Sequence, residues 1–490
     1  MLFTSIEFAA FLTVVFLVYW LVLNRSLQIQ NAFLLIAGYF FYGYWDWRFL
    51  MLLFALSLVN YVIGLQINRT HTTGIRKLWF LVGLFINIGV LGVFKYFNFF
   101  IDSFVDMVSV FGYHLSRSTT NIILPVGISF YVFLSLSYII DIFRGNLKAN
   151  RNIIEVLLTL SFFPIILAGP IQRPMSLLPQ ITRKRVFNHN SAVDGLRQIL
   201  WGLFVKIAVA DNIAQETDNI FFNIADYSGS TLLLGALLYT IQIYADFSGY
   251  SHIAIGTGRL FGFSLMQNFS YPYFARDISE FWKRWHISLT TWFRDYVFLP
   301  ISFSLSSKIS RQRILFIKTD LFIYIVASLV TWLLTGLWHG ASNTFVVWGF
   351  LNGIFLILFH WHRKPRKQAF KILNISNKNK ALAVAEGTLT FIVIVVFWII
   401  FRSDSLSQSL EYITGILTRS LLTFPDYLPK TALVTTGLLI ILEFIQRDKQ
   451  HALQIERINN RPLRWVVYVG TVLIILFFGG GSQNFIYFQF

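Results

Sequence analysis

Cysteine is absent from the 490 residues, and charged residues are scarce at 13%. Without cysteine the chain forms no disulfide, no cysteine-ligated zinc or iron–sulfur centre and no thiol nucleophile. A soluble globular chain carries about 25% charged residues, so this sequence lacks the polar side chains that a water-facing surface requires. Apolar residues make up 56%, which also argues against disorder. The composition therefore indicates an integral membrane protein.

Apolar runs that approach the length of a membrane crossing recur along the whole chain. A spanning helix needs about 20 mostly apolar residues. We therefore predict an all-α polytopic membrane protein with about 11–13 transmembrane helices, folded as a single integral-membrane domain over residues 1–490. The candidate spans are Ile6–Leu23, Asn31–Trp45, Phe49–Ile67, Leu78–Phe97, Ile122–Phe143, Ile154–Ile171, Leu196–Asn212, Ser230–Phe247, Leu321–Trp338, Phe345–Trp361, Leu389–Phe401, Thr431–Phe444 and Trp465–Phe478.

Basic residues outnumber acidic ones by 40 to 23, a net charge of +17. They lie between the apolar segments and form no continuous basic groove, so we predict no nucleic-acid partner. Basic loops lie on the cytoplasmic side of a membrane protein, which places Arg183–Arg185 and Arg363–Lys380 there. The first basic residue, Arg25, follows the first apolar run. This order predicts no cleaved signal peptide and an N-terminus outside the cytoplasm.

One apolar segment, Arg276–Ile301, carries many charged side chains. Charges at membrane depth normally face a cavity or pair with one another. Glu280 and Arg284 are spaced four residues apart, which suits an ion pair on a helix. We interpret the segment as an amphipathic or re-entrant element that lines a cavity, because irregular backbone is tolerated at that depth only inside protein or water.

A second segment, Thr331–Gly353, contains a helix break between two apolar runs. His339 ends the first run, Gly340 follows it, and Asn343 with its neighbours can cap the next helix. His339 and His286 are the two of nine histidines in such polar, break-rich apolar contexts. A buried neutral imidazole suits general-base activation of a hydroxyl. A structural histidine, a proton relay and a metal pair are the alternatives; metal-ligand spacing such as HExxH is missing, so we predict no metal.

Both histidines lie in motifs that resemble the membrane-bound O-acyltransferase (MBOAT) family, in its alginate-O-acetylase-like branch of polysaccharide O-acetyltransferases. These motifs are Phe281-Trp-Lys-Arg-Trp-His-Ile-Ser-Leu-Thr-Thr-Trp-Phe-Arg-Asp-Tyr296 and Leu337-Trp-His-Gly-Ala-Ser342. The resemblance covers nearly the whole chain. It also includes Leu124–Tyr131, Ser137–Asp141, Phe163–Pro170, Gly202–Asp211, Asp246–Tyr250, Asn268–Pro272 and Phe485–Phe490.

The resemblance implies a ring of transmembrane helices with re-entrant helices around a central tunnel, and acyl transfer to a hydroxyl. By motif match, His339 corresponds to the family's catalytic histidine, the expected general base, and His286 to the second histidine of this branch. Residues 276–353 would form the catalytic core segment. Further candidates for the substrate tunnel are Asn343, Asp246, Arg294, Asp295 and Trp338; for the three charged ones, a structural role in ion pairs or helix caps is somewhat favoured. Lys206 and Asp211 could pair across a helix turn or line a pore.

The resemblance also implies acetyl-CoA as the acyl donor, with no bound cofactor, and a polysaccharide acceptor on the outer side of the lipid bilayer. An SGNH-type periplasmic or membrane-anchored acetyltransferase would be the partner, in the inner membrane of a bacterium. Ser135, Ile165 and Ser302 depart from the usual pattern of this branch. These changes affect the polarity of the tunnel and therefore which acyl group and which acceptor it prefers. Two alternatives are D-alanyl transfer to teichoic acid from a carrier protein, and a non-catalytic transporter or flippase.

Overall fold

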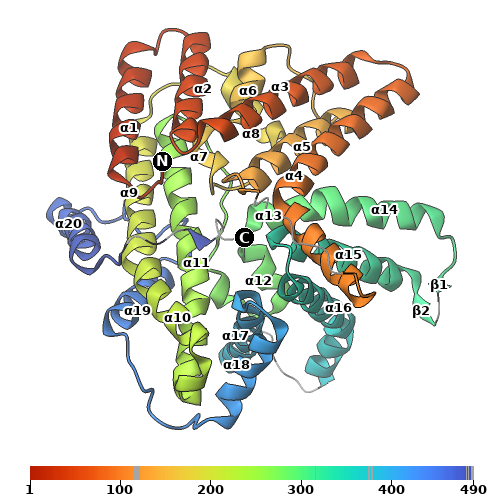
Figure 1. Cartoon of the computed structure of the whole chain (residues 1–490). Helices are drawn as coiled ribbons and strands as arrows, with labels where there is room; N and C mark the ends of the chain where they lie inside the picture. The colour runs from red at the N-terminus through yellow and green to blue at the C-terminus, as the bar shows by residue number, and fades with distance from the viewer. Residues whose placement is uncertain are drawn as a thin grey trace. The chain divides into compact units, whose positions relative to one another are not determined.

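The computed structural model describes residues 1–113, 122–314, 316–372, 376, 379–481, 483 and 485–486. Residues 487–490 of the C-terminal motif and Lys378 of the basic tract lie outside this set. Helices make up nearly all of the described regular structure (Figure 1). Two strands of two residues each, β1 (Arg313–Ile314) and β2 (Ile317–Lys318), pair antiparallel. The prediction of an all-α protein is confirmed.

The chain forms two compact units, one of residues 1–202 and 250–266 and the other of residues 203–249 and 267–490. The first contains α1 (Ile6–Leu17), the π-helical η1 (Val18–Val22), α2 (Leu27–Gly43), α3 (Trp47–Arg69), α4 (Thr73–Val110), α5 (Ile128–Arg144), α6 (Ile153–Leu160), α7 (Phe163–Ile166), α8 (Pro174–Thr182), most of α9 (His189–Leu203) and the end of α11 (Gly229–Leu260).

The second unit contains the start of α11 and the elements that surround the histidine motifs. They are η2 (Phe204–Ala210), α10 (Asp211–Phe222), η3 (Ile224–Asp226), η4 (Pro272–Phe274), α12 (Ile278–Arg284), α13 (Ile287–Phe293), η5 (Arg294–Phe298), α14 (Leu299–Lys308), α15 (Thr319–His339), α16 (Asn343–Ile372), α17 (Lys380–Arg402), α18 (Leu406–Thr418), α19 (Lys430–Ile445) and α20 (Arg461–Phe478).

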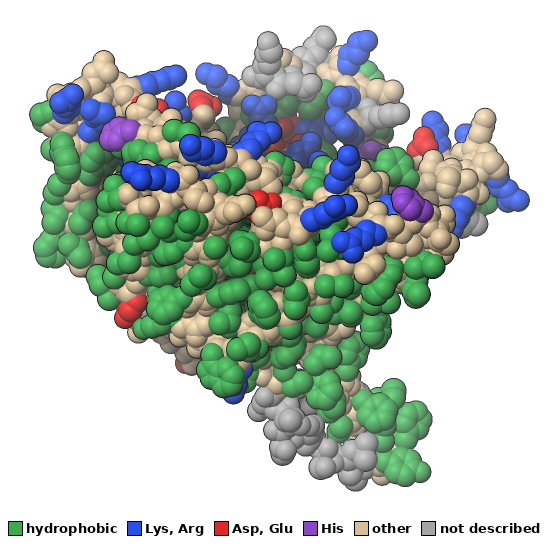
Figure 2. Space-filling view, turned by 90° about the horizontal axis from the view of Figure 1, so that it is seen from above, with side chains coloured by type: hydrophobic (Ala, Val, Ile, Leu, Met, Phe, Trp, Pro, Cys, Tyr) green, Lys and Arg blue, Asp and Glu red, His purple; other side chains and the backbone are tan. Residues whose placement is uncertain are grey.

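Seven helices among the described residues are long and apolar enough to cross a membrane. They include α3, α11, α15, α17 and α20 in full, and the apolar parts of α4 and α16. Large apolar side chains such as Ile6, Phe85 and Trp465 are exposed. Figure 2 shows a face on which hydrophobic side chains cover a broad area, with lysine and arginine gathered to one side of it. This surface suits a lipid environment and confirms a multi-pass membrane protein.

One predicted span is wrong as a continuous helix. Residues 154–171 form two short helices, α6 and α7, separated by Ser161 and Phe162, and the rest of the segment is irregular. Pro164 lies in the first turn of α7. Proline has no backbone N–H to continue a preceding helix, whereas its fixed φ suits a helix start. Both short helices are largely buried within their unit.

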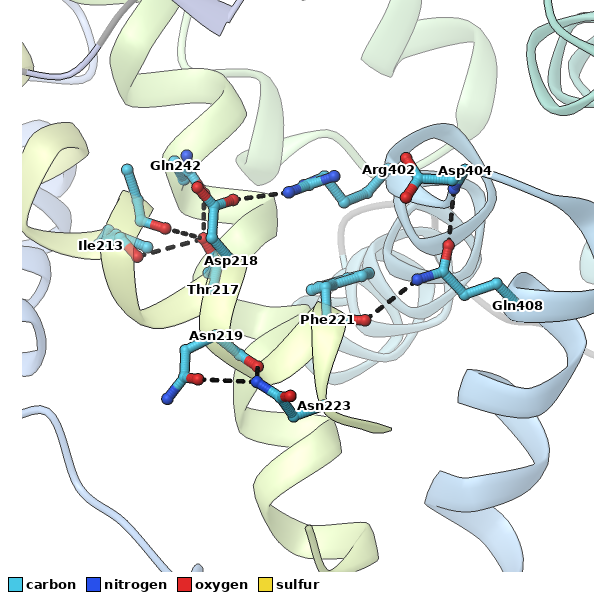
Figure 3. Close-up of polar contacts among 11 residues, drawn as sticks. Ile213, Thr217, Asp218, Asn219, Phe221, Asn223, Gln242, Arg402, Asp404 and Gln408 are labelled. Carbon is cyan, nitrogen blue, oxygen red and sulfur yellow. Dashed lines mark hydrogen bonds and ion pairs between the residues drawn. The ribbon is translucent and has the colours of Figure 1, made fainter. Parts of the chain in front are cut away.

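Polar contacts join helices within each unit, buried in the first unit and partly exposed in the second. In the first, Asn60 of α3 and Asn87 of α4 exchange side-chain hydrogen bonds of 3.2 and 2.8 Å. In the second, Arg402 at the end of α17 donates to Asp218 of α10 at 2.6 Å (Figure 3). Reciprocal pairing of this kind satisfies polar groups that would be costly to leave unpaired away from water.

Glycines allow α15 and α16 to pack closely. A Cβ atom at Gly336 would collide with the carbonyl oxygen of Phe345, and one at Gly349 with that of Trp332. Small residues permit this approach of two backbones in membrane proteins. The last turn of α15, which ends at His339, is therefore held against the first turn of α16.

Candidate active site

His286 lies at a sharp corner between two short helices. Asp277 caps α12 by accepting a hydrogen bond of 2.8 Å from the backbone N–H of Glu280. Arg284 pairs with Glu280 at 2.6 Å, which confirms the predicted ion pair. After α12 the backbone of His286 takes a left-handed conformation, φ 42°, and α13 begins at the next residue. Positive φ at a residue other than glycine is strained and is concentrated at functional sites.

The His286 side chain is almost fully buried, with 1% of its surface exposed. Its Nδ1 lies 3.0 Å from the Oδ1 atom of Asn268. The Phe247 ring meets it edge-on with centroids 4.6 Å apart, and the Trp338 ring lies at 6.0 Å. The imidazole is thus held on one nitrogen by an amide and on its sides by aromatic rings.

His339 is the last residue of α15 and is also buried. The rings of Trp338, Phe401 and Trp348 lie 4.8, 5.0 and 5.1 Å from its imidazole, each at a steep angle. At Gly340, which follows, any Cβ atom would collide with the Phe345 ring. The helix break that the sequence predicts at this point is confirmed, and its glycine is required sterically.

Both histidines line one cavity of about 540 Å³. Its walls are aromatic and hydroxyl-bearing, and the described residues of its lining include two cations and no carboxylate. Its lining includes Trp282, Lys283, Trp285, His286, Thr290, Thr291, Arg294, Tyr324, Ser328, Thr331, Trp332, Thr335, His339 and Trp348. The arrangement offers two imidazoles in an apolar, positively charged enclosure.

The other candidates are divided between the cavity and its surroundings. Arg294 lines the cavity and pairs with Asp295 at 2.8 Å. Trp338 lies behind the lining, with its ring near both imidazoles. Asn343 is exposed at the start of α16 and does not line the cavity. Asp246 does not line it either.

Asp246 belongs instead to a buried ionic cluster. The Lys206 ammonium lies 2.6 Å from a carboxylate oxygen of Asp246 and 2.6 Å from one of Asp211, which confirms the predicted contact with Asp211. The other oxygen of Asp246 accepts a hydrogen bond of 2.6 Å from the backbone N–H of Ile486. In this geometry Asp246 holds the C-terminal segment rather than facing the cavity.

Comparison with known proteins decides the family. The profile of MBOAT, the membrane-bound O-acyltransferase family, matches residues 146–396. The probable alginate O-acetylase AlgI of Pseudomonas syringae pv. tomato is 37% identical over 399 residues, 81% of this chain and 71% of that protein. The chain belongs to the membrane-bound O-acyltransferase family. It is therefore a multi-pass membrane O-acyltransferase.

Two further relatives of this acyltransferase have names that specify other polymers. The peptidoglycan O-acetyltransferase of Helicobacter pylori is 29% identical over 542 residues, 99% of this chain and 97% of that protein. The teichoic acid D-alanyltransferase of Bacillus subtilis is 27% identical over 258 residues, 51% of this chain and 62% of that protein.

Sequence reasoning missed two residues of this acyltransferase's site. Asn268 was included only within a matching motif, and no local pattern connects it to a histidine eighteen residues later. Lys283 was visible as a charge in the Arg276–Ile301 segment, and only the cavity shows that it lies in the same enclosure as His286 and His339.

Proposed function

We propose that this acyltransferase moves an acetyl group from acetyl-CoA to hydroxyl groups for O-acetylation of a cell-envelope or extracellular polysaccharide, with His339 as general base. The observation that carries the proposal is the placement of His339 and His286 in the lining of one cavity. The names of the relatives, alginate O-acetylase and peptidoglycan O-acetyltransferase, support an acetyl group and a polysaccharide.

The charges of the cavity support an anionic donor. Lys283 and Arg294 are both exposed residues of its lining, which includes no carboxylate among the residues that the structure describes; Asp295, the partner of Arg294, lies outside that lining. Acetyl-CoA carries phosphate groups, and a positive enclosure with low-dielectric walls attracts such a ligand. The indole rings of the wall leave an apolar space for the acetyl thioester.

The chemistry requires a base for the hydroxyl. The hydroxyl oxygen attacks the thioester carbonyl, and His339 takes the hydroxyl proton. The C–S bond breaks as the O-acetyl ester forms, and the proton passes from His339 to the leaving thiolate, giving CoA. General-base assistance of this kind contributes about 10²–10⁴-fold in rate.

The same proposal places the protein in the bacterial inner membrane with its N-terminus outside and the basic loops in the cytoplasm. The acetyl group would cross through a tunnel to an SGNH-type partner, periplasmic or membrane-anchored, which then modifies the polymer. Residues 276–353 would be the catalytic core. Similarity to teichoic acid D-alanyltransferases favours D-alanyl transfer from a carrier protein as the second candidate.

The test is CoA release from acetyl-CoA by the purified protein in lipid vesicles, with and without a candidate SGNH partner. Wild type is compared with His339→Ala, His339→Gln and, as a matched control, His71→Ala in an exposed loop. We expect both His339 variants to lose about 10²-fold or more and His71→Ala to keep wild-type turnover. Intrinsic tryptophan fluorescence and gel filtration confirm equal folding.

Three results would contradict parts of the proposal. Wild type that releases no CoA in the presence of partner overturns the acetyl-CoA donor and moves the carrier-protein candidate ahead. Polymer modification retained in His339→Gln overturns the base role and favours a transporter. Equal losses in His71→Ala and His339→Ala would show that the assay reports on folding alone.

A further inference from the structure

Three hydrogen bonds tie Asn268 to the corner at His286. The Oδ1 atom of Asn268 lies 3.0 Å from His286 Nδ1 and 2.8 Å from the hydroxyl oxygen of Ser288, and the Asn268 backbone carbonyl accepts from the N–H of Ile287 at 2.8 Å. Asn268 itself is completely buried. The side-chain amide therefore holds the ring that lines the cavity and the Ser288 hydroxyl, and the backbone carbonyl of Asn268 holds the backbone of the corner.

The identity of the acceptor atom fixes the proton on the ring. A carbonyl oxygen accepts hydrogen bonds and cannot donate them. As the Asn268 amide is oriented, the contact at 3.0 Å requires the proton to be on His286 Nδ1. In a neutral imidazole the other nitrogen, Nε2, then carries a lone pair. Burial at 1% exposure disfavours the doubly protonated, charged ring.

We infer that Asn268 is a positioning residue that holds His286 as the neutral Nδ1–H tautomer, so that His286 enters the reaction as an acceptor at Nε2. This inference rests on the proposed function for its role in turnover. In this state His286 accepts a proton or hydrogen bond and has no Nε2 proton to donate to an oxyanion. The developing oxyanion must then be stabilised by other donors, among which the cavity offers the cations Lys283 and Arg294.

The surroundings of His286 hold the orientation of its ring, so that Nδ1 keeps facing Asn268. The Phe247 ring packs edge-on against the imidazole at 4.6 Å, which opposes rotation about the side-chain bonds. The titratable groups that line the same cavity are Lys283, Arg294, Tyr324 and His339. None of them is a carboxylate, so no anion among the described lining residues favours a protonated ring.

The first test reads the tautomer directly and needs no activity. Protein labelled with ¹⁵N-histidine is reconstituted in lipid, and the His286 signals are identified by difference from His286→Gln. We expect a protonated Nδ1 and an unprotonated Nε2 at neutral pH, and a mixture of tautomers in Asn268→Ala. The reverse tautomer in wild type, or an unchanged spectrum in Asn268→Ala, overturns the inference.

The second test is the pH dependence of acetyl-CoA turnover in Asn268→Ala and Asn268→Asp. Alanine leaves the ring without its acceptor, and we expect a loss of about 10-fold or more at every pH. Aspartate keeps an acceptor for both Nδ1 and Ser288 but adds a negative charge, which raises the pKa of a neighbouring imidazole. The acid limb of the profile should therefore move to higher pH, with turnover recovering toward the wild-type value as the pH rises.

Asn87→Ala is the matched control, because Asn87 is an equally buried asparagine that pairs with Asn60 in the other unit. Loss of an amide with a purely structural role lowers the amount of folded protein but does not change the pH profile of turnover. Asn87→Ala should therefore keep the wild-type pH profile. Wild-type profiles in both Asn268 variants would refute the positioning role. Wild type inactive with acetyl-CoA would instead refute the proposed function, and the tautomer measurement would still decide the inference.

Discussion

Replacing Lys206 by methionine should destabilise the protein more than any single substitution at its two acidic partners. The Lys206 ammonium lies 2.6 Å from each of Asp211 and Asp246, and the three side chains are 2–5% exposed. One cation thus compensates two buried carboxylates. Methionine has a similar length and no charge, so the substitution leaves both acids without their counter-ion in a low-dielectric setting.

The expected cost follows from the burial of the cluster. Removing one partner of a buried ion pair costs about 3–5 kcal/mol, because an uncompensated charge stays buried or must take up a proton. Lys206 also donates at 3.2 Å to the backbone carbonyl of Gln483, so the C-terminal segment loses a contact. Asp211→Asn or Asp246→Asn leaves one cation facing one anion, and we expect a smaller loss.

The assay is thermal or denaturant unfolding followed by the fluorescence of the 14 tryptophans. Thiol-reactive dyes give no signal, since the chain has no cysteine. Arg48→Met is the control, because the Arg48 side chain of its pair with Asp46 is 60% exposed and an ion pair with so exposed a cation contributes little. In Lys206→Met/Asp211→Asn, part of the lost stability should return. An unfolding midpoint of Lys206→Met equal to that of Arg48→Met would refute the reasoning.

Three further predictions concern the site, the backbone and a loop. Trp338→Leu removes the ring that contacts both imidazoles and should lower acetyl-CoA turnover about 10-fold or more while the protein stays folded. Gly127 has φ 75°, and in Gly127→Ala the added Cβ atom would collide with the Ile166 carbonyl oxygen. The variant should lose about 1–3 kcal/mol of stability, seen as a lower midpoint of unfolding. Hydrogen bonds from Ser228 lower the pKa of Asp426 in the folded protein. The Asp426 carboxylate therefore stabilises the fold above its unfolded-state pKa, and this stabilisation is lost as the pH falls through its folded-state pKa. The difference in unfolding free energy between wild type and Asp426→Ala should accordingly shrink on acidification.

Local patterns predicted the parts of the site that depend on neighbouring residues. The break at His339 was visible because Gly340 and the polar residues after it separate two apolar runs, whereas the break at His286 was not predicted. The pair of Glu280 with Arg284 follows from helical spacing alone. Prediction was weaker for segment 154–171, where the apolar run masked a helix break at Pro164.

Contacts between distant residues could not be predicted in this way. Asp246 matched a motif and was assigned both a tunnel and a structural role, and only its contacts with Lys206 and Ile486 distinguish them. Its partner Ile486 lies 240 residues away in sequence. No periodicity connects residues at that separation, because their proximity depends on how whole helices pack.

The sequence by itself determined that this protein resides in a membrane, which residues interrupt its apolar runs and which two histidines carry the family motifs. Those features depend on composition and on spacing within a few helical turns. Only the tertiary structure decided that His286 and His339 share a cavity, that Lys283 and Arg294 belong to its lining, and that Asn268 contacts the His286 ring. Side chains from separate helices meet only when packing brings their backbones together, and that packing sets which nitrogen of an imidazole carries the proton.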